Sequence, residues 1–155
     1  MSSDVIDNYN VSKLYANLSD NSAYENSNNI FGIIEIPKIN IYYPIFSNLS
    51  DELLKIAPCK FYGSTLNRND NICIAGHNYQ KENKFYRLTE LETGDELYLL
   101  DNKNGKYRYI VSAIYQVKPE NTSPIDQETN GKRMVTLITC TKYSKNRIIV
   151  QALEG

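Results

Sequence analysis

The segment from Lys106 to Val117 constrains the fold most, because its apolar and aromatic side chains alternate with mostly polar neighbours. This alternation has the period of a half-buried β-strand. The wider composition agrees, since the chain has 13 Tyr and is rich in Ile, Val and Thr, which suit a pleated surface. We therefore expect an all-β fold. The alternating positions are Tyr107, Tyr109, Val111, Ala113, Tyr115 and Val117.

Length and charge limit what else the chain can be. Its 155 residues, 41% of them hydrophobic, are the size of one globular domain with a single core. The 17 basic and 18 acidic side chains give a net charge of -1, and no long basic run is present. We therefore expect no phosphate-binding surface and no nucleic-acid partner.

The chain changes character near residue 30. Residues 1–29 are rich in Asn, Ser and Asp, and four of their apolar side chains recur at the spacing of one short amphipathic helix: Val11, Leu14, Tyr15 and Leu18. The polar start lacks the features of a signal peptide, and no later run reaches membrane-spanning length. We expect 1–29 to be a linker segment and 30–155 to be the folded domain.

Several further strands are expected from β-rich runs between Pro, Gly and Asn signals. A helical turn is expected over 50–56 with Ser50 as N-cap. Loops are expected over 60–71 and 118–132, and a loop as long as the second is often functional. The expected strands are 31–36, 39–46, 72–75, 96–100, 134–139 and 148–152.

The last two strands frame a candidate nucleophile. Cys140 ends an apolar strand, and seven residues later, after a six-residue loop, Arg147 begins the next one. If the two strands form a hairpin, these residues lie at facing strand ends. A guanidinium beside a thiol favours the nucleophilic thiolate and can donate hydrogen bonds to a developing oxyanion.

A thiol nucleophile also needs a group that accepts a proton and later returns it. The chain's single histidine, His77, follows an apolar strand through Gly76 and suits both roles near neutral pH. Structural interpretations remain open at this point, because a Cys that ends an apolar strand is often a buried small hydrophobe. Zinc binding by Cys73, His77 and Cys140 lacks an obvious fourth ligand, so we expect no metal or other cofactor.

Two motifs resemble those of the sortase family of cysteine transpeptidases. Thr136-Leu-Ile-Thr-Cys140 is similar to the signature Thr-Leu-x-Thr-Cys, and Arg147 matches the Arg of the following strand. Asn71-Ile-Cys-Ile-Ala-Gly-His77-Asn is similar to the second signature, followed by the Phe85-Tyr-Arg-Leu turn. The order and spacing of the motifs agree. The resemblance covers residues 30 to 153.

The resemblance implies a single eight-stranded β-barrel with a few short helices. It implies that Cys140 attacks the Thr carbonyl of an LPXTG-like sorting signal, that His77 protonates the leaving amine, and that Arg147 stabilises the substrate or its oxyanion. Thr139, Ala75 and Asn78 are the candidates for binding or orienting the substrate. The loop 118–132 is expected to border the groove for that signal.

The family also implies partners and a location. The partners are a surface-protein sorting signal and an amine, either a cell-wall peptide or a pilin lysine. The location is the outer face of a Gram-positive cell membrane, with the chain an ectodomain lacking its anchor. Where many members carry Gly and His, this chain has Pro58-Cys59-Lys60. Cys73 is expected in the core, and Cys59 is a candidate for an exposed, oxidisable thiol.

Two other functions fit the same residues. A cysteine hydrolase would pass the thioacyl intermediate to water, and no motif marks the difference. A non-catalytic β-barrel binding module would carry an unreactive Cys140.

Overall fold

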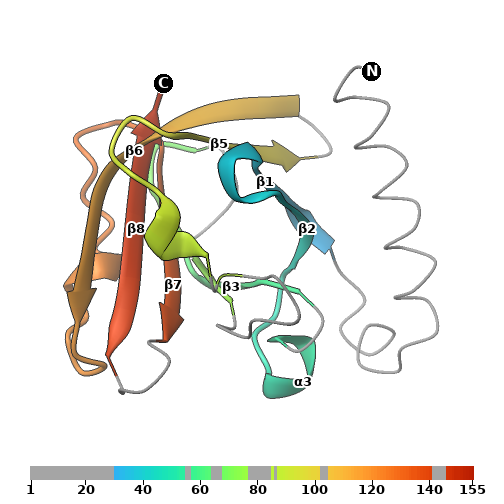
Figure 1. The fold of residues 1–155 in the computed structure, drawn as a ribbon, viewed down its shortest axis with the longest axis vertical. Helices are drawn as coiled ribbons and strands as arrows, with labels where there is room; N and C mark the ends of the chain where they lie inside the picture. Colours follow the sequence, from blue (N-terminus) through green and yellow to red (C-terminus); the bar gives the residue numbers. More distant parts are fainter. Residues whose placement is uncertain are drawn as a thin grey trace.

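Eight strands close into a single barrel in the part of the chain that the structure describes (Figure 1). The structure is a computed structural model and describes residues 30–54, 57–63, 68–76, 85, 87–101, 105–140 and 146–155. The strand order is β1-β2-β3-β4-β7-β8-β6-β5. The expected all-β, eight-stranded fold is confirmed. The elements are β1 (Ile30–Ile36), η1 (Pro37–Ile39), β2 (Ile41–Phe46), α3 (Asp51–Leu54), β3 (Cys59–Tyr62), β4 (Asn71–Ala75), η3 (Leu88–Glu90), β5 (Glu96–Asp101), β6 (Gly105–Val117), η4 (Ser123–Ile125), β7 (Met134–Cys140) and β8 (Arg147–Glu154).

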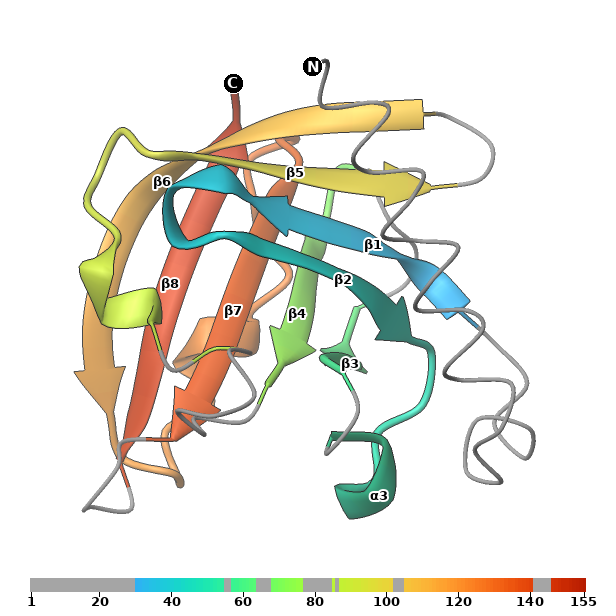
Figure 2. The same cartoon turned by 45° about the vertical axis from the view of Figure 1, so that its right-hand side comes forward.

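Of the two parallel pairings in the described sheet, the one between β4 and β7 positions the strand that carries the candidate nucleophile. β4 pairs in parallel with β7 from Asn71↔Met134 to Ala75↔Ile138. β7 then pairs antiparallel with β8, so β4, β7 and β8 are neighbouring strands of one sheet (Figure 2). The second parallel pairing, β2 with β3, consists of a single residue pair. The remaining contacts of the barrel are antiparallel.

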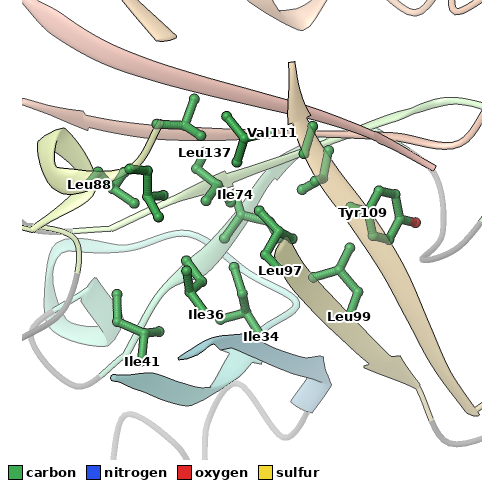
Figure 3. Packing of buried hydrophobic residues seen from close by; sticks show 14 of the residues in the cluster. Ile34, Ile36, Ile41, Ile74, Leu88, Leu97, Leu99, Tyr109, Val111 and Leu137 are labelled. Carbon is green, nitrogen blue, oxygen red and sulfur yellow. The ribbon is translucent and has the colours of Figure 1, made fainter. Parts of the chain in front are cut away.

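The barrel interior is filled by β-branched and leucine side chains (Figure 3). Ile34, Leu97 and Leu137 are completely buried there, and they come from three different strands. Each such side chain stabilises the fold by about 1.5–3 kcal/mol through the area that it removes from water. Tyr109 packs at the edge of the same cluster with 1% of its surface exposed.

The long strand β6 does not keep one face towards the core. Tyr109 and Val111 face the interior as expected, but the register shifts by one residue between Val111 and Ala113. Such a bulge places an extra residue in one strand and reverses the alternation beyond it. Ile114 therefore packs on the core, and Tyr115 lies opposite Ile149 on the other face. The expectation that all six alternating residues share a face is wrong past the bulge.

The helical turn expected after Ser50 is α3, and it begins as predicted. Ser50 Oγ accepts a hydrogen bond from the backbone N–H of Leu53 at 3.1 Å, which is the N-cap geometry. α3 then packs Leu53 against Phe46 and Cys59. Cys59 is completely buried in this small cluster, so the prediction of an exposed thiol there is wrong.

Two predictions about segments outside the strands have different outcomes. The expected loop 60–71 begins with a strand, because Lys60 and Tyr62 of β3 pair with β4. Tyr62 is 50% exposed. The strand therefore lacks the alternation of apolar and polar residues that would have marked it in the sequence. The amphipathic helix expected within 1–29 lies outside the described residues. None of the helices in the described ranges has the length and apolar character needed to cross a lipid bilayer.

Candidate active site

Cys140 and Arg147 are direct partners across the β7–β8 hairpin. They form its last register pair, at the end where the two strands are joined by the short connection 141–146. Cα atoms of antiparallel partners lie about 5 Å apart, so the two residues are neighbours where the two strands meet the connection. Arg147 also pairs with Val117 at the end of β6. The prediction that Cys140 and Arg147 lie at facing strand ends is confirmed.

β4 brings the chain that leads to His77 to the same end of the sheet. Ala75 lies beside Ile138, and the Gly76 N–H donates a hydrogen bond to the Ile138 carbonyl at 3.0 Å. Ile138 precedes Cys140 by two residues, and Gly76 immediately precedes His77. His77 and Asn78 themselves lie outside the described residues, so their roles remain predictions.

Gly76 is required at this point because Phe85 packs directly against it. A Cβ atom on Gly76 would lie 2.5 Å from Cδ2 and 2.7 Å from Cγ of the Phe85 ring, closer than two carbons can approach. Phe85 is completely buried, so its ring cannot swing into solvent. This contact explains why the Gly before His77 and the Phe85 turn occur together in the sequence.

The other two substrate-binding candidates differ in exposure. Ala75 is partly exposed and lies on the face of β4 opposite the core residues Ile72 and Ile74. Thr139 has only 2% of its surface exposed, and its hydroxyl has no hydrogen-bond partner among the described residues. This burial suits orientation of the site better than direct contact with a substrate. Both assignments remain predictions.

Cys73 lies on the same outer face of β4 as Ala75, but it is shielded from solvent. It is completely buried, and burial raises the pKa of its thiol to about 12, although a hydrogen bond with Thr136 acts in the opposite direction. A thiol with such a pKa is almost entirely protonated at neutral pH and is a poor nucleophile. Cys73 is therefore buried as predicted, but outside the central core cluster.

The register also argues against the zinc site considered from the sequence. Cys73 lies beside Thr136, which precedes Cys140 by four residues. At about 3.3 Å per residue the two cysteine backbones are more than about 13 Å apart. Two thiolates on one zinc would have to approach within about 5 Å of each other, since each Zn–S bond is about 2.3 Å. Cys73 and Cys140 therefore cannot share a zinc ion.

A buried polar cluster lies under the loop between β6 and β7, and it was not predicted from the sequence. Asn71, Thr136 and Gln151 come from three neighbouring strands, and Gln127 comes from the loop. Gln127 also lines an open cavity of about 660 Å³ together with Phe61, Tyr62 and three further residues, Lys60, Gly63 and Asp70. A polar Asn at the first position of an apolar strand was the one available signal.

A family model described as a sortase domain matches residues 34–154 of the chain. Among related proteins, sortase A of Streptococcus agalactiae serotype III (strain NEM316) is 34% identical over 140 residues, covering 84% of this chain and 56% of the relative. Sortase A of Bacillus anthracis is 29% identical over 118 residues, covering 76% of this chain and 55% of the relative. The chain thus spans about half the length of these relatives.

Solved structures give the same result. Sortase C-1 from Actinomyces oris superimposes with a TM-score of 0.74 at 26% identity, covering 81% of this chain and 72% of that one. The pilus-related sortase C of Group B Streptococcus also gives 0.74, at 29% identity, with 81% and 67% covered. Both similarities extend over most of the barrel described above.

Proposed function

Because the chain belongs to the sortase family, we propose that it is a cysteine transpeptidase with Cys140 as its nucleophile. His77 is the general acid and base, and Arg147 stabilises the oxyanion. The observation that carries the proposal is the pairing of Cys140 with Arg147 at the end of the β7–β8 hairpin, next to the strand that runs into His77. A guanidinium at this place favours the thiolate and can donate a hydrogen bond to a developing oxyanion.

The reaction takes place in two acyl transfers. The Cys140 thiolate attacks the Thr carbonyl of the sorting signal and forms a tetrahedral oxyanion, to which Arg147 donates hydrogen bonds. The C–N bond to Gly then breaks as His77 gives a proton to the leaving amine, which leaves a thioester on Cys140. The second amine loses a proton to His77 as it attacks the thioester, and the new amide forms as the thiolate departs.

The substrate that we propose is an LPXTG-like sorting signal in extended conformation. β4 extends over four residue steps from Asn71 to Ala75, which is about 13 Å. Four extended residues upstream of the cleaved bond cover a similar length. A signal whose Thr carbonyl lies at Cys140 is therefore long enough to reach back along β4 and β7 to the loop that carries Gln127.

The second substrate is an amine, either a cell-wall peptide or a pilin lysine. One of the similar structures is named as a pilus-related sortase C, which supports including the pilin lysine. We propose that the reaction occurs at the outer face of a Gram-positive cell membrane. Residues 1–29 would then link the barrel to a membrane anchor.

Mass spectrometry of acyl transfer tests this proposal. The protein is incubated with a panel of sorting-signal peptides, with and without amines, and compared with Cys140→Ala, His77→Ala and Arg147→Ala. We expect a thioacyl adduct and an amine-joined product that both require Cys140. Cys59→Ala is the matched control, because the Cys59 thiol is completely buried in a separate cluster. This substitution should leave the products unchanged.

Each alternative predicts a different product pattern. Cleavage that added amine does not divert would identify a hydrolase. Identical products from the parent and Cys140→Ala would refute the assignment of the nucleophile. A Cys140 that resists alkylation, with no product from any peptide, would identify a binding module.

A further inference from the structure

Asn71 joins β4 to the loop between β6 and β7 by a set of buried hydrogen bonds. Its side chain is completely buried on the outer face of the barrel. Its Nδ2 donates to the carbonyls of Pro124 at 2.8 Å and Asp126 at 3.1 Å, both of which belong to the loop. Its Oδ1 accepts a hydrogen bond from Thr136 Oγ1 of β7 at 2.7 Å. One amide thus holds two strands and a loop together.

Gln127 makes the reciprocal contacts from the loop. Its Oε1 accepts a hydrogen bond from the backbone N–H of Asn71 at 3.1 Å, and its Nε2 donates to the Asn71 carbonyl at 2.9 Å. The same Nε2 donates to the Ile125 carbonyl at 2.9 Å. The backbone of Asn71 is therefore bonded to a loop side chain at the first residue of β4, beside the start of β7.

Thr136 is the member of the cluster that the sequence motif contains but the proposed chemistry does not use. It donates to Asn71, and its Oγ1 accepts from Gln151 Nε2 of β8 at 3.3 Å. It is completely buried and stands four residues before Cys140. Its place in the signature is explained by this bridge between Asn71 and Gln151.

The hydrogen bonds of the cluster are complete only while the β6–β7 loop lies against β4. If the loop moved away, the Asn71 amide would exchange its two loop carbonyls for water, and Gln127 would lose its bonds to the Asn71 backbone. Each of these intramolecular hydrogen bonds makes a modest net contribution to stability, and several of them act together on one short segment. The loop is therefore held in one position before any ligand arrives, at the far end of β4 from Cys140.

We propose that Asn71 and Gln127 are positioning residues that hold the β6–β7 loop as a preformed wall of the peptide groove. This inference rests on the proposed function, since the groove is the one that would take the sorting signal. A wall fixed in advance removes the entropy cost of ordering a loop on binding. The Asn71–Gln127 pair, called the loop clamp below, therefore sets the affinity and selectivity for the peptide. It leaves the chemical step at Cys140 unaffected.

Near-isosteric variants test the clamp. Asn71→Asp keeps the acceptor for Thr136 but places an oxygen against the Pro124 and Asp126 carbonyls. Gln127→Glu does the same opposite the Asn71 and Ile125 carbonyls. Glu92→Gln, exposed on the connection between η3 and β5 and outside the loop, is the matched control. Gln127 is partly exposed, so its variant decides the matter if Asn71→Asp does not fold.

The measurements are kcat and KM for the best peptide, the rate of Cys140 alkylation by iodoacetamide, and hydrogen exchange of 118–132 without peptide. We expect KM to rise about tenfold or more in both variants, as for the loss of buried hydrogen bonds. We expect kcat within about threefold of the parent, unchanged alkylation and faster loop exchange. A general loss of structure would change the alkylation rate as well.

Three results would overturn the proposal in distinguishable ways. A parent that transfers no peptide refutes the proposed function, and the recognition role with it. A working parent whose folded Asn71→Asp and Gln127→Glu variants keep its KM and loop exchange refutes the clamp alone. A fall in kcat at constant KM would likewise show that these residues do not act through binding.

Discussion

Replacing Gly76 with alanine should damage the site through one contact with Phe85. The added Cβ would lie 2.5 Å from Phe85 Cδ2, about 1 Å inside the usual carbon–carbon contact distance. Neither partner can yield easily, because Gly76 N–H is bonded to Ile138 and the ring is completely buried. Overpacking of this kind costs about 1–3 kcal/mol, which lowers Tm by about 3–10 °C in a domain of this size.

Thermal unfolding and peptide transfer are measured on the same samples. Gly76→Ala should lose both stability and activity, because the strain falls on the residue before His77. Gly94→Ala is the control: Gly94 has φ +97° with open space around it, so alanine there costs stability through backbone strain alone. It should unfold earlier than the parent and retain full transfer activity.

A second substitution identifies the contact. Phe85→Leu creates a cavity and destabilises the protein by itself, but it also makes room for the new methyl group. Gly76→Ala with Phe85→Leu should therefore be more stable than the sum of the single changes by at least about 0.5 kcal/mol. Additive effects, or a Gly76→Ala protein with the parent's Tm and activity, would refute the packing explanation.

Three further predictions concern titratable and polar groups. Native protein treated with iodoacetamide at pH 8 should gain one adduct, on Cys140, and three after denaturation, because Cys59 is buried and the pKa of Cys73 is about 12; two native adducts, found by peptide mapping, would contradict this. Thr139→Val should leave Tm unchanged or raise it, since the buried hydroxyl lacks a partner among the described residues, whereas a fall in transfer activity alone would reveal an orienting role. The pKa of Asp95 is lowered first by the backbone N–H of Glu92 and then by the paired ammonium group of Lys38. Its contribution to stability should therefore be present above pH 3.8, the ordinary pKa, and be lost as the pH falls through the lower folded-state value. In acid titrations monitored by circular dichroism, Asp95→Asn should show a shallower loss of stability than the parent.

Local patterns predicted the features that depend on one strand or one turn. The Ser50 cap and the Cys140–Arg147 pairing depend on residues within a few positions of each other, and both were found. The reversal of faces in β6 was not predictable in this way. A bulge at Val111 and Ala113 carries no Gly or Pro to mark it, and it becomes visible only when β8 is paired with the strand.

The burial of Cys59 and Asn71 shows a second limit of sequence reasoning. Cys59 is enclosed by Phe46, Leu53 and Ala57, which approach it from β2 and the α3 turn. Asn71 finds its partners more than 50 residues away in the β6–β7 loop. A side chain's surroundings depend on such distant segments, so neither residue type nor local spacing revealed them.

The spacing within the Thr136–Cys140 motif follows from the position of β7 between β4 and β8. Leu137 is buried in the core, Thr136 is bonded to the loop clamp, and Cys140 ends the strand opposite Arg147. A shift of one residue in β7 would turn the core side chains outward, because strand positions alternate between faces. It would also separate Thr136 from Asn71 and Cys140 from Arg147 in the same step. The packing of the barrel, the seating of the loop and the placement of the nucleophile therefore depend on one register, which explains why residues with such different tasks form one uninterrupted motif.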